Sequence, residues 1–199
     1  MSGVWLEWIR PCVALFLMGL TVKLIDDGLD RDYDKARGHI SIAVKLGRGL
    51  SAYTALTALV AAWMNLSIAL AVFFGSYAAG MFKDWREPLP TRVPAWVEIV
   101  IVAILAVVML NWQLAVWGIA MMSTIDWLDD VMDAARDEKT GQFNLANKFG
   151  LIEALILILI ALSVAVFTNV KLTALTLITL PFVDWVAQAL SSVERGGNR

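Results

Sequence analysis

The sequence has very little of what disulfide-bonded folds, zinc sites and nucleic-acid-binding surfaces require. Its single cysteine, Cys12, excludes a disulfide bond within the chain. Its single histidine, His39, excludes a zinc site built from several imidazole and thiolate ligands. The 16 basic and 18 acidic residues give a net charge of -2, so no surplus of positive charge favours nucleic acid as a partner.

Long uncharged runs are what the sequence has instead. Hydrophobic residues make up 59% of the chain, against about 45–50% in ordinary soluble domains. The excess gathers in runs typical of membrane-spanning helices, so we predict an all-α integral membrane protein with about seven transmembrane helices. The expected helices cover residues 4–25, 49–64, 67–83, 94–110, 112–128, 150–167 and 171–190. Tight breaks are expected at Asn65, Asn111 and Asn169, and longer charged connections at 26–48, 84–93 and 129–149.

Basic residues are distributed unevenly between the two ends of these expected helices. Of the 16 Lys and Arg residues, all except Arg10 and Lys171 fall on the side that holds the charged connections. Cytoplasmic loops of membrane proteins carry an excess of Lys and Arg. The charged connections are therefore predicted to face the cytoplasm.

One acidic pattern occurs twice in the chain. Residues 26–34 and 129–137 both read DDxxDxxxD, 103 positions apart. The register continues without a gap to Gly47 and its counterpart Gly150, with eight of 22 positions identical. The two segments are therefore interpreted as copies of one structural unit.

This internal repeat predicts how the chain is organised. We expect a single membrane domain over residues 1–199, made of two parallel repeats at about 1–93 and about 94–199. Parallel repeats place equivalent segments on the same side of the membrane, so both acidic motifs are expected to emerge together.

Spacings of three and four residues put the aspartates of each motif on one helix face. Like charges at this spacing destabilise a helix, and a membrane boundary adds a desolvation cost, so the clusters need cations. Magnesium takes one or two carboxylates and completes its shell with water and substrate phosphates. We therefore predict a diphosphate clamp bridged by magnesium. The predicted metal ligands are Asp26, Asp27, Asp30, Asp34, Asp129, Asp130, Asp133 and Asp137.

Basic side chains near the motifs are candidates for neutralising the phosphates. Lys45 and Lys148 are favoured because they occupy equivalent repeat positions. The remaining cations are explained equally well as cytoplasmic anchors. The predicted diphosphate-binding residues are Arg37, Lys45, Lys83, Lys139 and Lys148.

These motifs resemble those of the UbiA superfamily of intramembrane prenyltransferases. Residues 26–34 are similar to the family's NDxxDxxxD motif, with Asp26 in the asparagine position, and residues 130–137 to its DxxDxxxD motif. Residues 140–150 resemble its basic-Thr-Leu-Pro…Gly stretch, and residues 82–85 its central loop with a diphosphate-binding lysine. The chain departs from the family in having Tyr77 six residues before Lys83 rather than four, and seven expected helices rather than nine.

The resemblance implies a UbiA-like helical bundle that acts as a magnesium-dependent prenyltransferase. An isoprenyl diphosphate would ionise, and the prenyl group would pass to a lipophilic acceptor whose identity stays open. With two helices fewer than is usual, the cavity would open to membrane lipid or be closed by a homo-oligomer or a partner subunit. The catalytic residues implied are Asp27, Asp30, Asp34, Asp130, Asp133 and Asp137.

Two alternatives to prenyl transfer stay open. One is a UbiA-type membrane class I terpene synthase or cyclase, which needs no acceptor. The other is a non-catalytic membrane subunit that binds a lipid diphosphate. His39 is interpreted as a base or, more simply, an interfacial side chain. Aromatic residues that could stabilise a carbocation, or simply pack, are Tyr53, Phe73, Phe74, Tyr77 and Trp117.

Overall fold

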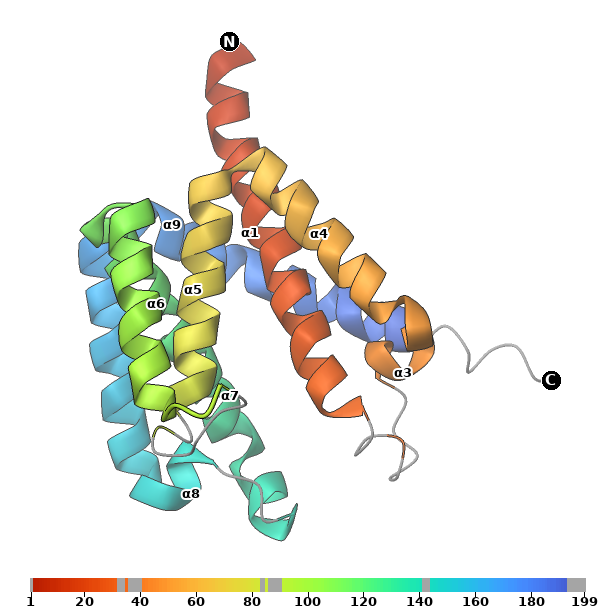
Figure 1. Ribbon diagram of the computed structural model, residues 1–199, viewed down its shortest axis with the longest axis vertical. Coiled ribbons are helices and arrows are strands. Elements are labelled where there is room, and N and C mark those ends of the chain that lie inside the picture. The colour runs from red at the N-terminus through yellow and green to blue at the C-terminus, as the bar shows by residue number, and fades with distance from the viewer. Residues whose placement is uncertain are drawn as a thin grey trace, which may run out of the picture. The chain divides into compact units, whose positions relative to one another are not determined.

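The fold is all-helical in a computed structural model that describes residues 2–31, 35, 41–82, 85, 91–140 and 144–192 (Figure 1). Helix accounts for 93% of the structure, and these described ranges contain no strand. The prediction of an all-α fold is therefore confirmed for this part of the chain. The elements are α1 (Ser2–Leu29), α3 (Ile42–Leu46), the 3-10 turn η1 (Gly47–Gly49), α4 (Leu50–Met64), α5 (Leu66–Phe82), α6 (Ala95–Met109), α7 (Trp112–Thr140), α8 (Leu145–Phe149) and α9 (Leu151–Ser192).

Two helices run further than the apolar pattern predicted. Helix α1 continues to Leu29 rather than 25, and α7 continues to Thr140 rather than 128. The predicted ends marked where the long hydrophobic runs stop, whereas residues such as Ala134, Ala135 and Glu138 favour helix without forming such a run. The connections expected at 26–48 and 129–149 are thus partly helical, and they also contain α3 and α8.

Three asparagines interrupt the helices as predicted. Asn65 and Asn169 have almost the same extended torsions, with φ/ψ of -156°/98° and -157°/85°. The Asn65 side-chain oxygen accepts a hydrogen bond from the Ile68 N–H, and Asn169 does the same for Leu172. Asn111 likewise accepts from the N–H three residues later. Each asparagine therefore ends one helix and caps the start of the next.

The short helices α3 and α8 repeat each other in register. Both have five residues, and their bounds differ by the same 103 positions that separate the acidic motifs. Each follows a residue in extended conformation and ends at a glycine with positive φ, 53° at Gly47 and 104° at Gly150. Glycine adopts such torsions without the steric cost that a Cβ imposes. The sequence repeat is thus also a repeat of local structure.

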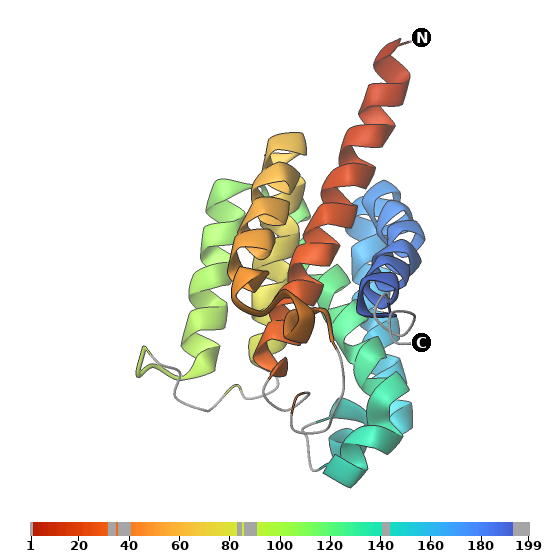
Figure 2. The same ribbon diagram turned by 90° about the vertical axis from the view of Figure 1, so that its right-hand side faces the viewer.

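By packing, the chain divides into two compact units. The first comprises Met1–Ala69 and Ala174–Arg199, and the second Leu70–Thr173. In the first unit α1 lies beside α4 (Figures 1 and 2), where the buried Thr21 hydroxyl lies 2.8 Å from the Thr57 hydroxyl. Leu24 of α1, Ile42 of α3 and Ala187 of α9 form its apolar cluster.

In the second unit α5 and α7 approach closely. A Cβ added at Gly118 of α7 would lie 2.3 Å from the Ala71 carbonyl oxygen of α5, and a Cβ at Gly75 would lie 2.3 Å from the Gly118 oxygen. Such contacts between small residues let helix backbones touch. The neighbouring Trp117 is fully buried, and its indole N–H donates to the Thr173 hydroxyl of α9 at 3.1 Å.

Two helices among the described residues are long and apolar enough to cross a membrane, Leu6–Leu29 and Leu151–Ser191. The most apolar windows of these helices are only 28% and 22% buried within the protein. A core helix of a soluble domain would be mostly covered by protein. Helix α6 is shorter, and it too exposes large apolar side chains such as Ile101, Ile104 and Val108.

Candidate functional site

The second acidic motif lies inside α7, and Asp130 is its most buried described residue. The Asp130 side chain is 6% exposed, and its carboxylate accepts a hydrogen bond from the Leu145 N–H of α8 at 3.0 Å. Asp129 is exposed and Asp133 is partly buried. Asp137 also lies in α7, but its side chain is outside the described set. The motif therefore presents carboxylates both to α8 and to solvent.

Asn144 joins α8 to α7 from a buried position. Its side-chain oxygen caps α8 by accepting from the N–H groups of Ala146 and Asn147, at 2.9 and 3.3 Å. Its side-chain nitrogen donates to the Asp130 carbonyl oxygen. The Asn147 amide adds a bond to the Ala134 carbonyl at 2.8 Å. The start of α8 is thus tied to the helix that carries the motif.

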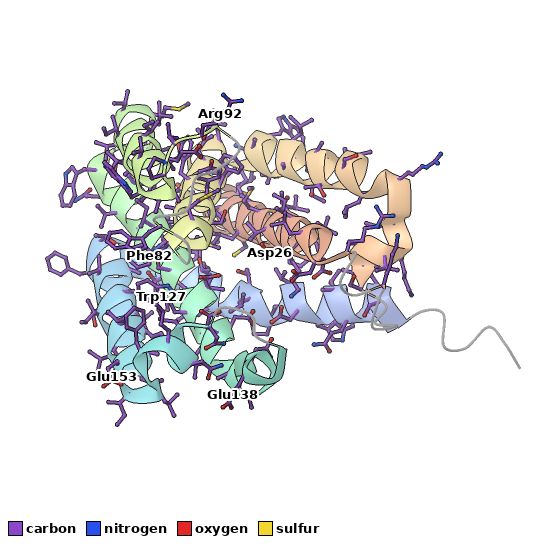
Figure 3. The ribbon with its side chains drawn as sticks, turned by 60° about the horizontal axis from the view of Figure 1, so that its bottom comes forward. Asp26, Phe82, Arg92, Trp127, Glu138 and Glu153 are labelled. Atoms are coloured by element: carbon purple, nitrogen blue, oxygen red, sulfur yellow. The ribbon has the colours of Figure 1, made fainter. Side chains whose placement is uncertain are left out.

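A cavity of about 240 Å³ opens beside this junction, entirely within the second unit. It has one acidic and one basic lining residue, Asp130 and Lys148, set among mostly aromatic walls. In Figure 3, Phe82 of α5 and Trp127 of α7 lie together, with ring centroids 6.0 Å apart. The lining residues are Phe82, Trp85, Trp127, Asp130, Leu145, Lys148 and Phe149.

Backbone and side-chain contacts hold the Trp85 wall of this cavity. The Trp85 carbonyl accepts from the Trp96 N–H of α6 at 2.9 Å. Nearby, the Glu98 carboxylate accepts hydrogen bonds from the hydroxyls of Tyr77 and Thr91. These bonds connect α5, the residues before α6, and α6 itself. They join Tyr77 of α5, Trp85 and Thr91 to α6.

The first acidic motif lies in the other unit, at the end of α1. Asp26 (labelled in Figure 3) and Asp30 are exposed, and the Asp27 carboxylate lies 3.8 Å from the Lys23 ammonium one turn earlier. The C-terminal end of a helix carries partial negative charge, so carboxylates there are unfavourable. A bound cation would relieve that repulsion. Asp34 is outside the described residues.

The predicted basic residues divide into three groups. Lys148 lines the cavity, with its ammonium 5.5 Å from the Phe149 ring centroid. Lys45, its repeat counterpart, instead donates to the Leu190 carbonyl at 3.0 Å, close to the end of α9. A cation there complements the negative end of the helix dipole. Outside the described structure lie Arg37, Lys83, His39 and the side chain of Lys139.

Magnesium is the metal that the sequence predicts. Among the described residues, no group of three or more acidic, histidine or cysteine side chains gathers closely enough to hold a metal ion. The donor set still fits magnesium, because this ion commonly takes one or two protein carboxylates and fills its shell with water and phosphate oxygens. Of the predicted metal ligands, the described carboxylates are Asp26 and Asp27 at the end of α1, Asp30 just after it, and Asp129, Asp130 and Asp133 on α7.

Sequence reasoning did not identify all the residues of this site. The sequence analysis marked neither Trp85 nor Trp127 as a site residue, yet both line the cavity. Asn144 was recognised only as part of a motif, although an asparagine just before a short apolar helix is a capping signal. Neither Phe82 nor Phe149 carries a pattern that would have marked it as a lining residue.

The aromatic residues considered for carbocation contact or for simple packing are not among those that line this cavity. Trp117 and Phe74 are buried in the packing of the second unit, and Tyr77 binds Glu98. Tyr53 and Phe73 are 53% and 43% exposed. The cavity beside Asp130 is therefore walled by other rings than those expected.

Comparison with known proteins identifies no relative. No protein-family model, no curated protein and no solved structure matches the chain significantly.

Proposed function

We propose that this chain is a magnesium-dependent intramembrane prenyltransferase similar to the UbiA superfamily. It would ionise an isoprenyl diphosphate and transfer the prenyl group to a lipophilic acceptor. The observation that carries the proposal is the cavity beside the second motif, where Asp130 and Lys148 meet aromatic walls. The doubled DDxxDxxxD pattern supports it, because the sequence places a second set of carboxylates at the end of α1.

The proposed reaction needs a metal ion, a basic side chain and aromatic ring faces. When bound, magnesium would supply charge neutralisation at the departing diphosphate. The carbon–oxygen bond to the diphosphate breaks, and its electron pair leaves with the phosphate oxygen. Lys148 would stabilise that negative charge, and the faces of Trp85 and Trp127 would stabilise the allylic cation. The acceptor then forms the new bond to carbon and loses a proton.

Membrane embedding is part of the same proposal. The apolar faces of α6 and α9 are exposed, and contiguous apolar surface of this kind fits contact with lipid. The distribution of Lys and Arg supports an orientation with both acidic motifs on the cytoplasmic side. A soluble diphosphate would reach the motifs from that side, while its apolar tail enters from the membrane.

The experiment is diphosphate release by purified protein in lipid nanodiscs. Geranyl, farnesyl and geranylgeranyl diphosphates are offered with magnesium or with EDTA. The variants are Asp27→Asn and Asp130→Asn, which remove charge while keeping an oxygen that can accept a hydrogen bond. Asp184→Asn, an exposed acid of α9 outside both motifs, is the matched control. The proposal expects magnesium-dependent release that both motif variants lose and the control keeps.

The organic products distinguish the proposed reaction from its alternatives. Release that needs an added membrane lipid extract, with prenylated lipid as product, supports transfer. Release of diphosphate without any added acceptor, with cyclic or dehydrated hydrocarbons as products, would support terpene synthesis instead of prenyl transfer. Binding of the isoprenyl diphosphate without release of diphosphate under every condition would support a non-catalytic subunit instead of either reaction.

A further inference from the structure

We infer that Asn144 is the positioning residue of the second acidic motif, and that it holds Asp130 and Lys148 at one cavity. The inference rests on the proposed function, because it gives Asn144 a role in that site. It assigns Asn144 no contact with substrate. The side chain acts through the two charged residues that it places.

Asn144 is buried, and its side chain is hydrogen-bonded at both ends of the amide. The side chain is 2% exposed and uses both of its amide atoms. The nitrogen donates to the Asp130 carbonyl of α7, and the oxygen accepts from Ala146 and Asn147 at the start of α8. One amide therefore fixes the register of α8 against the motif.

The register of α8 sets the positions of Leu145 and Lys148 relative to Asp130. Leu145 follows directly and donates its N–H to the Asp130 carboxylate at 3.0 Å, which orients this side chain. The Lys148 N–H bonds to the Asn144 carbonyl at 3.0 Å, so Lys148 lies one helical turn further along. Asp130 and Lys148 then line the same cavity. The buried Leu145 and Ala146 of this five-residue helix also pack against Val131 and Ala134 of α7.

The first repeat has a different side chain at the equivalent position. Ser41 is the counterpart of Asn144. Its backbone is also extended, and it also directly precedes a five-residue helix. Its side chain is 6% exposed, makes no capping bond, and has no hydrogen-bond partner for its hydroxyl among the described residues. Lys45 there bonds to the Leu190 carbonyl. The side-chain amide of Asn144 therefore distinguishes the start of α8 from the start of α3 in the first repeat.

The test is Asn144→Asp against Asn147→Asp. An aspartate at 144 keeps the capping oxygen and loses the donor to the Asp130 carbonyl. The same change at 147 removes an amide donor to Ala134 from the same short helix without touching Asp130. Two quantities are measured in nanodiscs: hydrogen exchange of the Leu145 amide, and kcat and KM for magnesium-dependent diphosphate release. Melting curves confirm that each variant is folded.

We expect Asn144→Asp to speed Leu145 exchange about tenfold through the weakened hydrogen bond. It should lower kcat about 10–100-fold, the usual effect of removing an orienting partner, with a smaller change in KM. Asn147→Asp removes one bond between α8 and α7 but keeps the bond to Asp130, so it should change both quantities much less. Equal behaviour of the two variants would overturn the inference. If Asn144→Asp fails to fold, Asn144→Ser, which copies the first repeat, takes its place.

The two proposals fail in distinguishable ways. If the wild-type protein shows no magnesium-dependent diphosphate release, the proposed function is wrong. Hydrogen exchange of the Leu145 amide then decides by itself whether Asn144 positions Asp130. Wild-type release with an unaffected Asn144→Asp would leave the function standing and remove the positioning role.

Discussion

The backbone of α7 at Gly118 lies against the Ala71 carbonyl of α5, where a Cβ on Gly118 would come within 2.3 Å of the oxygen. No side chain fits into that space without moving one helix. Helices α5 and α7 carry Phe82 and Trp127 of the cavity wall. Their close contact therefore determines the spacing of the aromatic rings beside the second motif.

Gly118→Ala should destabilise the protein. The obstacle is a backbone oxygen rather than a flexible side chain, and overpacking of this kind typically costs about 1–3 kcal/mol. Gly80→Ala on α5 is the matched control, because a Cβ there meets nothing within 4 Å. Alanine in a helix is favoured over glycine by up to about 1 kcal/mol, so the control should be neutral or slightly stabilised. Thermal unfolding in detergent measures both, and equal midpoints would contradict the close contact.

Trp117 and Thr173 should be energetically coupled. Thr173→Val leaves the buried indole N–H without its acceptor, at a cost of about 0.5–2 kcal/mol. In the Trp117→Phe background the same substitution should cost less, because no N–H remains to satisfy. Thr168→Val is the control, since that hydroxyl donates only to carbonyls of its own helix. A double-mutant cycle on unfolding free energies gives the coupling, and strict additivity would rule it out.

Lys148 and Lys45 should differ in function although they occupy equivalent repeat positions. Lys148→Gln removes the cationic lining residue and should reduce kcat/KM for diphosphate release by about tenfold to a hundredfold, as for loss of a charged hydrogen bond. Lys45→Gln should leave kcat/KM close to wild type, because that ammonium binds the Leu190 carbonyl. It should instead speed hydrogen exchange in the last turn of α9. Steady-state kinetics on both variants measures the difference. A larger loss of kcat/KM for Lys45→Gln than for Lys148→Gln would show that Lys45, not Lys148, acts on the diphosphate.

Labelling of introduced cysteines tests the proposed orientation in the membrane. The chain has one cysteine, so Cys12→Ala provides a background without thiols. Arg48→Cys and Lys171→Cys then place single thiols at two exposed positions that the sequence puts on opposite sides. A maleimide that cannot cross membranes should label position 48 in inside-out vesicles and position 171 in intact cells. Labelling of both positions from one side would refute the predicted topology.

Much of the helical structure could be predicted because its signals are local. Apolar runs marked the helices and the breaks at Asn65 and Asn169, where the structure shows the asparagine side chain capping the helix that follows. The helix beyond residue 128 was missed because charged and alanine-rich sequence carries no apolar pattern. The site was predicted in part: the motif identified Asp130, but the partners Leu145 and Asn144 depend on how α8 folds back onto α7.

By itself, the sequence determined the helical class of the described chain and the 103-residue repeat of its acidic segments, because hydrophobic runs and identical positions are properties of neighbouring residues. Only the tertiary structure decided what the repeated residues do. Lys45 and Lys148 have the same sequence context, yet one binds the end of α9 and the other lines an aromatic cavity. The physical reason is that a side chain's partners come from segments distant in the chain, and Ser41 and Asn144 offer those segments different hydrogen bonds.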